Sequence, residues 1–155
     1  MSRKIGYLLF VLIVLNFGAL ALGSFLMGRG PMDIWYQSLN KAPWTPPGWV
    51  FGAAWFTIML CLSIALANHF SRKKDRTLVI VYSIHLVLNI TWNYLFFNQH
   101  LMLLGLIEIL LLTCFVGYMM FYLGKERKLN GFLLSPYFIW LCIASSLNMC
   151  ALIHN

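Results

Sequence analysis

The sequence consists of long apolar stretches separated by polar connections. Five of these stretches approach or reach the ~20 residues that an α-helix needs to cross a lipid bilayer. Backbone polar groups cannot stay unpaired in lipid, and the alternation typical of membrane β-strands is absent, so each stretch is predicted to be a helix. We predict an all-α integral membrane protein, in which residues 1–155 form a single five-transmembrane-helix domain. The stretches lie near Ile5–Met27, Gly48–Asn68, Leu78–Phe97, Met102–Leu123 and Phe132–Ile153.

The first stretch has a second interpretation. Arg3-Lys4 precedes it and Ala19-Leu-Ala21 resembles a cleavage site, which is the pattern of a secretory signal peptide. The apolar run continues to Leu26, however, beyond the usual length of a signal core. We therefore expect an uncleaved first helix.

The connection between the first two stretches is long and aromatic. Residues 35–51 contain three tryptophans, a tyrosine and three prolines. Long connections in compact proteins are usually functional or disordered, and a high aromatic content argues against disorder. We predict that this connection folds back as a lid over the helix ends. The alternative is an aromatic belt at the lipid–water interface.

Composition supports the membrane assignment. Hydrophobic residues make up 61% of the chain and charged residues only 10%, whereas soluble domains carry about 25% charged residues. The net charge of +7 is compatible with a nucleic-acid partner. The basic residues fall in clusters between the apolar stretches, however, so membrane topology explains them and no nucleic-acid partner is expected.

The basic residues divide unequally between the two sides of the membrane. Only Arg29 and Lys41 lie in the aromatic connection, whereas nine lie in the N-terminal, second and fourth polar segments. Basic residues concentrate on the cytoplasmic side. The N-terminus is therefore predicted to be cytoplasmic, and the C-terminus to lie outside, in a multi-pass protein of the cell membrane. The nine are Arg3, Lys4, Arg72, Lys73, Lys74, Arg76, Lys125, Arg127 and Lys128.

Standard catalytic and cofactor motifs are missing: the chain has no Gly-rich phosphate loop, no nucleophile elbow and no His-Glu-x-x-His motif. Its four cysteines lie in apolar stretches without Cys-x-x-Cys spacing, which predicts free thiols. The histidines lack metal-ligand spacing, although any one of them could ligate a haem iron. We therefore expect no metal site and no required cofactor. The histidines are His69, His85, His100 and His154.

Polar and aromatic side chains recur at helical spacing in the third and fifth stretches. Such spacing places each set on one face of its helix. Amides in lipid must find partners, so both faces are predicted to point into the bundle. There they would either bond neighbouring helices or line a site for an apolar ligand that carries a polar group. The sets are His85, Asn89, Trp92 and Phe96, and Tyr137, Trp140, Ala144 and Asn148.

Glu108 is the only acidic residue within a predicted span. An intramembrane carboxyl group is a functional candidate by default. The structural alternative is a hydrogen bond to a loop amide or a hydroxyl group.

Three motifs carry a family resemblance. The first is Trp35-Tyr-x-x-Leu-x-Lys41-x-x-Trp44-x-Pro-Pro47-x-Trp49-Val, followed by Trp55. The second is Asn89-x-x-Trp92 with Phe96-Phe97, and the third is Pro136-Tyr137-x-x-Trp140-x-x-x-Ala144-x-x-Leu147-Asn148. Together they resemble the TspO/MBR family, also called the translocator protein, tryptophan-rich sensory protein or peripheral-type benzodiazepine receptor family. The short chain resembles a bacterial member.

The resemblance implies a five-helix bundle, commonly a homodimer in the lipid bilayer, with a pocket under the first loop. It implies binding of protoporphyrin IX or haem and of benzodiazepine-type or isoquinoline carboxamide drugs. By motif position, Trp49 and Trp140 match the tryptophans linked to light-dependent porphyrin breakdown. The implied ligand-binding residues are Trp35, Trp49, Asn89, Trp92, Phe96, Trp140 and Ala144.

Two departures from the family pattern bear on the ligand. The usual Lys-Pro-x-Trp becomes Lys41-Ala-Pro-Trp44, which moves one proline of the lid. The cholesterol pattern of animal members is absent from residues 147–155, which disfavours a sterol ligand.

Three functions remain open at this point. The first is a tetrapyrrole-binding sensor or regulator, and the second is an enzyme-like protein that degrades protoporphyrin under light. The third is a transporter of porphyrins or other lipophilic molecules. Five helices without an inverted repeat disfavour alternating access by the chain alone.

Overall fold

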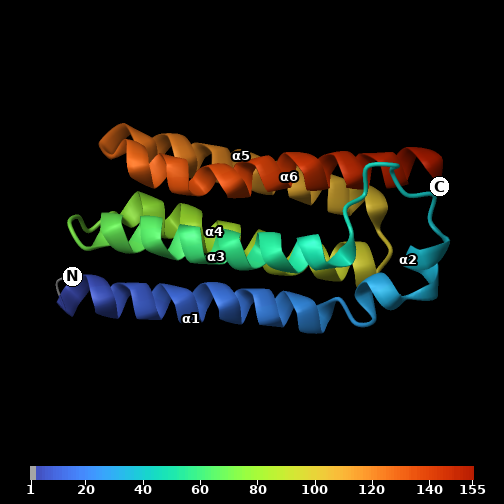
Figure 1. Cartoon of the computed structure of the whole chain (residues 1–155), viewed down its shortest axis with the longest axis horizontal. Helices are drawn as coiled ribbons and strands as arrows, with labels where there is room; N and C mark the ends of the chain where they lie inside the picture. The colour runs from blue at the N-terminus through green and yellow to red at the C-terminus, as the bar shows by residue number, and fades with distance from the viewer. Residues whose placement is uncertain (1–2) are drawn as a thin grey trace.

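The computed structural model describes residues 3–155, which form helices and no strand (Figure 1). The long helices are α1 (Arg3–Leu26), α3 (Gly48–Phe70), α4 (Arg76–Asn93), α5 (Met102–Glu126) and α6 (Lys128–His154). The first connection contains η1 (Gly30–Met32) and α2 (Ile34–Ser38), and a π-helical turn, η2 (Tyr94–Asn98), continues α4. Five segments are long and apolar enough to cross a membrane, which confirms the predicted fold class.

The helices extend beyond the predicted apolar stretches at several ends. α4 begins at Arg76 rather than near Leu78 because Asp75 caps it: the Leu78 N–H donates to Asp75 Oδ1 at 3.1 Å. α6 begins at Lys128 rather than near Phe132. Hydropathy marks only the part of a helix that suits lipid, whereas backbone hydrogen bonding continues until a cap or a break ends it.

The long helices pack in a closed ring in the order α1, α3, α6, α5 and α4, and α4 returns to α1. Their axes run along the long dimension of the molecule, and the first connection lies at the end opposite the N-terminus (Figure 1). Leu62, Met119 and Leu141 are buried in the interior, while Phe10 and Leu110 are exposed on the outer surface. Because lipid is as apolar as this interior, close packing rather than exclusion of water holds the helices together.

α5 and α6 approach each other closely where Gly131 faces Gly124. A methyl group added at Gly131 would lie 2.7 Å from Gly124 Cα and 2.9 Å from the Met120 carbonyl oxygen. These are backbone atoms, which cannot rotate away as the end of a side chain can. We expect Gly131→Ala to lower the free energy of unfolding by about 1–3 kcal/mol, the usual cost of overpacking. The measurement is the thermal unfolding midpoint in detergent.

Gly18→Ala is the matched control, because Gly18 lies within α1 with nothing within 4 Å of an added methyl group. Alanine is favoured over glycine inside a helix by roughly 0.5–1 kcal/mol. Gly18→Ala should therefore keep or raise the midpoint. Equal midpoints for the two variants would show that the α5–α6 crossing tolerates the extra volume.

A buried chain of hydrogen bonds joins α1, α3 and α4. The Tyr82 hydroxyl donates to Asn16 Oδ1 at 2.7 Å, and Asn16 Nδ2 donates to Ser63 Oγ at 2.8 Å. Ser63 in turn donates to the Met59 carbonyl oxygen at 2.7 Å. Because an unpaired polar atom in lipid is costly, this chain fixes how the three helices are rotated relative to one another.

A charged cluster ties together the ends of α3, α4 and α5 at the end of the bundle that carries the N-terminus. The His69 ring lies between two carboxylates, with Nε2 3.0 Å from Asp75 Oδ2 and Nδ1 2.9 Å from Glu126 Oε2. Burial alone would raise the pKa of Asp75. Hydrogen bonds from the Tyr122 hydroxyl, the Leu78 N–H and His69 outweigh it and hold the pKa below its usual value. The carboxylate form of Asp75 is therefore favoured by folding.

Candidate ligand-binding cavity

The chain turns directly after α1. Gly28 and Gly30 have φ angles of 64° and 49°, in the left-handed region that glycine adopts without strain. A side chain at Gly30 would also lie 2.5 Å from Met27 Sδ. After this turn, η1 and α2 lie across the open end of the bundle (Figure 1). The predicted lid is therefore present as an ordered segment, residues 28–47.

One side of the lid rests on the connection between α4 and α5. Trp35 stacks on the His100 ring with 4.0 Å between ring centroids and 14° between planes. Its ring also meets the edge of Phe96 at 5.7 Å. The Trp35 ring of the lid therefore packs against aromatic rings of the helix bundle.

The other side of the lid is attached to α6. The Asn40 backbone N–H donates to Asn155 Oδ1 at 2.9 Å, and Trp44 Nε1 donates to Ser146 Oγ at 3.1 Å. Ala42, which stands where the family usually has proline, is buried, and its carbonyl oxygen accepts the Thr45 N–H at 3.0 Å. The lid is thus held by polar contacts at α6 and by ring packing at α4.

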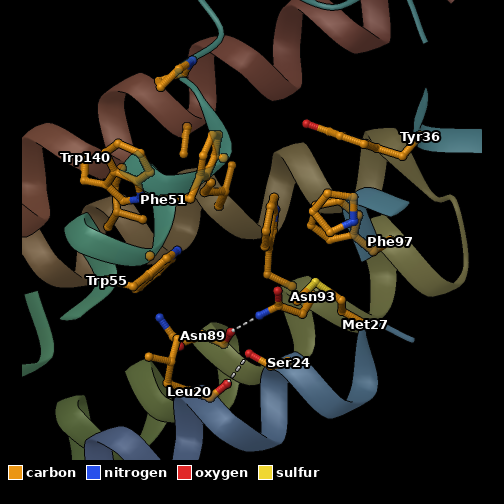
Figure 2. Close-up of a pocket in the computed structure, with 18 of the residues that line it drawn as sticks. Leu20, Ser24, Met27, Tyr36, Phe51, Trp55, Asn89, Asn93, Phe97 and Trp140 are labelled. Carbon is orange, nitrogen blue, oxygen red and sulfur yellow. Dashed lines mark hydrogen bonds between the residues drawn. The ribbon is translucent and has the colours of Figure 1, made fainter. Parts of the chain in front are cut away.

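A cavity of about 480 Å³ lies beneath the lid, and side chains from all five long helices line it (Figure 2). Its size lies within the range of about 300–1,000 Å³ that is typical of small-molecule sites. The lining is mostly apolar and rich in aromatic rings. The aromatic residues on it are Tyr36, Phe51, Trp55, Trp92, Phe97 and Trp140.

α3 and α6 form one wall of the cavity. Phe51 meets the Trp140 ring edge to face, with 5.1 Å between centroids and 84° between planes. Trp55, one turn further along α3, meets the buried Tyr137 ring at 5.8 Å. Ala144 lies one turn beyond Trp140 on α6 and lines the same cavity. The small side chain of Ala144 leaves space beside the Trp140 indole.

α4 and its π-helical turn form the opposite wall. Trp92 lies on the cavity and stacks on Phe96 at 5.3 Å with only 7° between planes. The side-chain amide of Asn148 is oriented so that both its oxygen and its nitrogen form hydrogen bonds. Asn148 Oδ1 accepts from Trp92 Nε1 at 3.3 Å, and Asn148 Nδ2 donates to the Met102 carbonyl oxygen at 3.1 Å. The indole N–H is therefore already bonded within the protein. π-Helical turns are frequent at functional sites.

Asn89 is the buried polar residue of the cavity lining. Its Nδ2 donates to the Tyr137 hydroxyl oxygen at 2.7 Å. Its Oδ1 accepts no hydrogen bond within residues 3–155, so it is available to a ligand donor. Asn93, one turn above, donates to the Asn89 carbonyl oxygen, and Ser24 donates to the Leu20 carbonyl oxygen (Figure 2). A mostly apolar cavity with a few placed polar groups is the usual form of a ligand site.

Lys41 supplies positive charge at the mouth of the cavity, and it is the only charged side chain that the described part of the chain contributes to the lining. Its Nζ lies 4.9 Å from the centroid of the Tyr36 ring and donates to the Gln37 carbonyl oxygen at 3.2 Å. Partial burial raises the pKa of Tyr36, so its hydroxyl stays neutral near pH 7. Arg29 does not line the cavity.

The structure brings together four of the seven residues implied as ligand-binding: Asn89, Trp92, Trp140 and Ala144 line the cavity. Phe96 lies behind Trp92 and is only 4% exposed. Trp35 lies on the far side of Phe96, against His100. These two residues support the wall rather than form its surface.

Trp49 does not line the cavity, and its side chain is 75% exposed. The α3 residues on the cavity are Gly48, Phe51, Gly52 and Trp55. Successive helix residues are rotated by about 100°, so position 49 lies well away from the face that these four share. Trp55, rather than Trp49, is the α3 tryptophan that shares the cavity with Trp140.

Several lining residues were not singled out from the sequence. Phe51, Trp55 and Tyr36 belong to this group. Trp55 stood within the family motif, and steps of three and four from Gly48 would have placed it with Phe51 on one helix face. Tyr36 lies on the short helix of the lid, where no helix-face pattern could place it.

Neither Glu108 nor any histidine lines the cavity. The Thr91 hydroxyl donates to Glu108, which agrees with the structural alternative considered above. His85 is buried against Tyr137, with 2.9 Å between Nε2 and the hydroxyl oxygen. Within residues 3–155, no cluster of three or more metal-ligating side chains occurs, and the four cysteines are free.

Comparison with known proteins gives one consistent result. The sequence profile of the TspO/MBR family matches residues 10–153. The chain is 32% identical over 129 residues to the tryptophan-rich protein TspO of Chlorobaculum tepidum, covering 81% of this chain and 82% of that one. It is 34% identical over 137 residues to the protein of the same name from Archaeoglobus fulgidus, covering 86% and 87%. It is 28% identical over 140 residues to the human translocator protein, covering 87% and 82%.

Proposed function

The chain belongs to the TspO/MBR family, and on this basis we propose that it is a membrane-embedded receptor for tetrapyrroles, with protoporphyrin IX or haem as ligand and a sensing or regulatory role. The observation that carries the proposal is the cavity under the lid. A flat apolar macrocycle suits two walls of aromatic rings, and carboxylates at its edge suit the Lys41 ammonium group at the mouth.

Asn89 adds a specific polar contact to this proposal. Its free Oδ1 lies on the cavity lining, where it can accept a hydrogen bond from a pyrrole N–H of a metal-free porphyrin. Benzodiazepine-type and isoquinoline carboxamide drugs, which are also flat and largely apolar, would compete for the same space. Sterols are rigid aliphatic molecules that gain less from stacked rings, so we expect them to bind more weakly.

Spectral titration tests the proposal directly. The purified protein in detergent is titrated with protoporphyrin IX, haem and cholesterol, and porphyrin absorbance and tryptophan fluorescence are recorded. We expect saturable binding of the porphyrins with quenching of tryptophan. Absence of saturable binding, or tighter binding of the sterol, would rule the proposal out.

Lys41→Met should weaken binding of protoporphyrin IX by up to about fivefold, because an exposed ion pair contributes only about 0–1 kcal/mol. Methionine keeps much of the length and apolar stem of the side chain. The control ligand is the dimethyl ester of protoporphyrin IX, which lacks the carboxylates but keeps the macrocycle. Its affinity should be unchanged by the substitution. An equal loss for both ligands would mean that Lys41 acts through the shape of the lid alone.

A second candidate function is light-driven oxidation of the bound porphyrin. The observation that favours it is the presence of three indole rings on the cavity lining, those of Trp55, Trp92 and Trp140. Dioxygen is the oxidant: an indole gives an electron to the excited porphyrin, and the resulting porphyrin radical anion reacts with dioxygen, so this chemistry needs no acid–base pair. It also needs no metal ligand.

We further propose that the N-terminus is cytoplasmic and that the lid and C-terminus lie outside the cell membrane. The nine-to-two division of basic residues supports this orientation. In intact cells, Ser38→Cys should react with an impermeant thiol reagent, and Lys74→Cys should react only after the cells are opened. Both positions are exposed, and the parent chain gives the background from its own cysteines. The reverse pattern would invert the topology. The homodimer stays a prediction.

A further inference from the structure

Behind the cavity wall lies a buried pair of a phenol and an imidazole. Tyr137 on α6 is 1% exposed and His85 on α4 is fully buried. The Tyr137 hydroxyl oxygen lies 2.9 Å from His85 Nε2 and 2.7 Å from Asn89 Nδ2. The two rings are nearly perpendicular, with 5.4 Å between centroids.

The hydrogen bonds determine where the proton of Tyr137 lies. Asn89 Nδ2 is an amide nitrogen and can only donate, so the Tyr137 oxygen accepts from it. The Tyr137 O–H is then free to donate to His85 Nε2, which places the hydrogen of the neutral imidazole on Nδ1. Nδ1 has no hydrogen-bond partner among the described residues, so no contact opposes this tautomer. Tyr137 is therefore a phenol that points its proton at a base.

The same phenol ring touches the cavity wall. Trp55 lies on the cavity lining, and its ring meets Tyr137 at 5.8 Å between centroids with 70° between planes. Ring contact at this distance allows an electron to move directly between the two side chains. Trp55 thus stands between the cavity and the buried pair.

We propose that Tyr137 is a one-electron donor to oxidised Trp55, with His85 as the proton acceptor. Loss of one electron from Trp55, to an excited tetrapyrrole in the cavity, leaves an indole radical cation and a tetrapyrrole radical anion. One electron then moves from Tyr137 to Trp55, while the phenolic proton moves to His85 Nε2. The products are neutral Trp55, a neutral Tyr137 phenoxyl radical and a His85 imidazolium ion.

The charge balance favours this route in an apolar interior. A phenol that loses an electron must also lose its proton, and within residues 3–155 imidazole is the only base bonded to Tyr137. The positive charge passes from Trp55 to His85, so no new charge is created where charges are costly. Tyr82 stacks on the other side of His85 at 5.8 Å, but its hydroxyl donates to Asn16, an amide that cannot take up a proton. The geometry therefore selects Tyr137 over Tyr82.

The physiological use of this step rests on the light-driven function proposed above, but its test needs no porphyrin. Ultraviolet light ejects electrons from indole rings, and the radicals formed in the frozen protein are identified by electron paramagnetic resonance. We expect a phenoxyl signal that narrows with ring-deuterated tyrosine. Labelling histidine with ¹⁵N should change the nitrogen coupling of that signal from a ¹⁴N to a ¹⁵N pattern, because Tyr137 is the described tyrosine whose hydroxyl bonds a histidine. These measurements use the unaltered chain.

Substitutions then assign the radical. Tyr137→Phe should remove most of the phenoxyl signal and leave an indole signal, and the control Tyr82→Phe should keep the phenoxyl signal. His85→Gln keeps a hydrogen-bond acceptor without a base, so it should lower the phenoxyl yield while the indole signal rises. A full phenoxyl signal in Tyr137→Phe, no ¹⁵N coupling in the parent, or an unchanged yield in His85→Gln would each overturn the proposal. A protein that passes this test yet binds no porphyrin would refute the proposed function alone.

Discussion

Substitution of Ala144 by phenylalanine is expected to reduce the affinity for protoporphyrin IX by about 100-fold, or about 2.7 kcal/mol. Ala144 lines the cavity one turn from Trp140, where its methyl group leaves space beside the indole. A phenyl ring there would occupy the volume that a flat ligand needs. The expected loss of binding free energy lies within the roughly 1–3 kcal/mol that extra side-chain volume usually costs in a well-packed region, such as the cavity with its ligand bound. The measurement is the same spectral titration as for the parent protein.

Cys142→Phe is the matched control for this prediction. Cys142 lies on α6 two residues before Ala144, and it is exposed on the outside of the bundle. A phenyl ring at this position would project away from the cavity, so the affinity should stay within about twofold, an effect below 0.5 kcal/mol. Comparable losses for both variants would mean that α6 is disturbed as a whole. Parental affinity in Ala144→Phe would show that the ligand does not enter this cavity.

Replacement of Trp55 or Trp140, two of the three tryptophans on the cavity lining, by phenylalanine should separate binding from light-driven chemistry. Phenylalanine keeps an aromatic ring but lacks the easier oxidation of indole. Trp55→Phe and Trp140→Phe should bind protoporphyrin IX within about tenfold of the parent, since an aromatic pair contributes about 0.5–1.5 kcal/mol. Both should lose most of the light-driven breakdown, by more than about tenfold, which corresponds to about 1.4 kcal/mol in the barrier. Porphyrin absorbance under illumination is the readout.

Trp49→Phe provides the control for the same experiment. The family resemblance had placed the chemistry at Trp49 and Trp140, but the Trp49 ring is exposed outside the cavity. Its replacement should leave binding and breakdown unchanged. If Trp49→Phe abolished breakdown while Trp55→Phe did not, the reacting porphyrin would have to lie outside the cavity. Unchanged breakdown in all three variants would leave Trp55 and Trp140 as walls of the site.

The sequence by itself determined the fold class and the faces of two helices. Lipid leaves helices as the only way for long apolar segments to pair their backbone groups, so the hydropathy pattern was sufficient to predict five of them. Polar residues are rare in such segments. The recurrence of His85 and Asn89, and of Tyr137 and Asn148, therefore marked inward faces, and all four side chains are buried. Apolar residues do not mark the inward face of a helix in this way, because they occur on the lipid-facing side as well.

Only the tertiary structure decided which apolar residues line the cavity. In a soluble protein the outer face of a helix is polar, but here the lipid-facing and core-facing residues are equally apolar. Helical spacing puts Trp49 and Trp55 on different faces of α3, but it does not show which of the two faces points inward. The sequence also did not show which buried polar side chains form hydrogen bonds with each other. Glu108 meets Thr91 and His85 meets Tyr137 because of how α4 is rotated against α5 and α6, and that rotation is set by close packing of side chains distant in the chain.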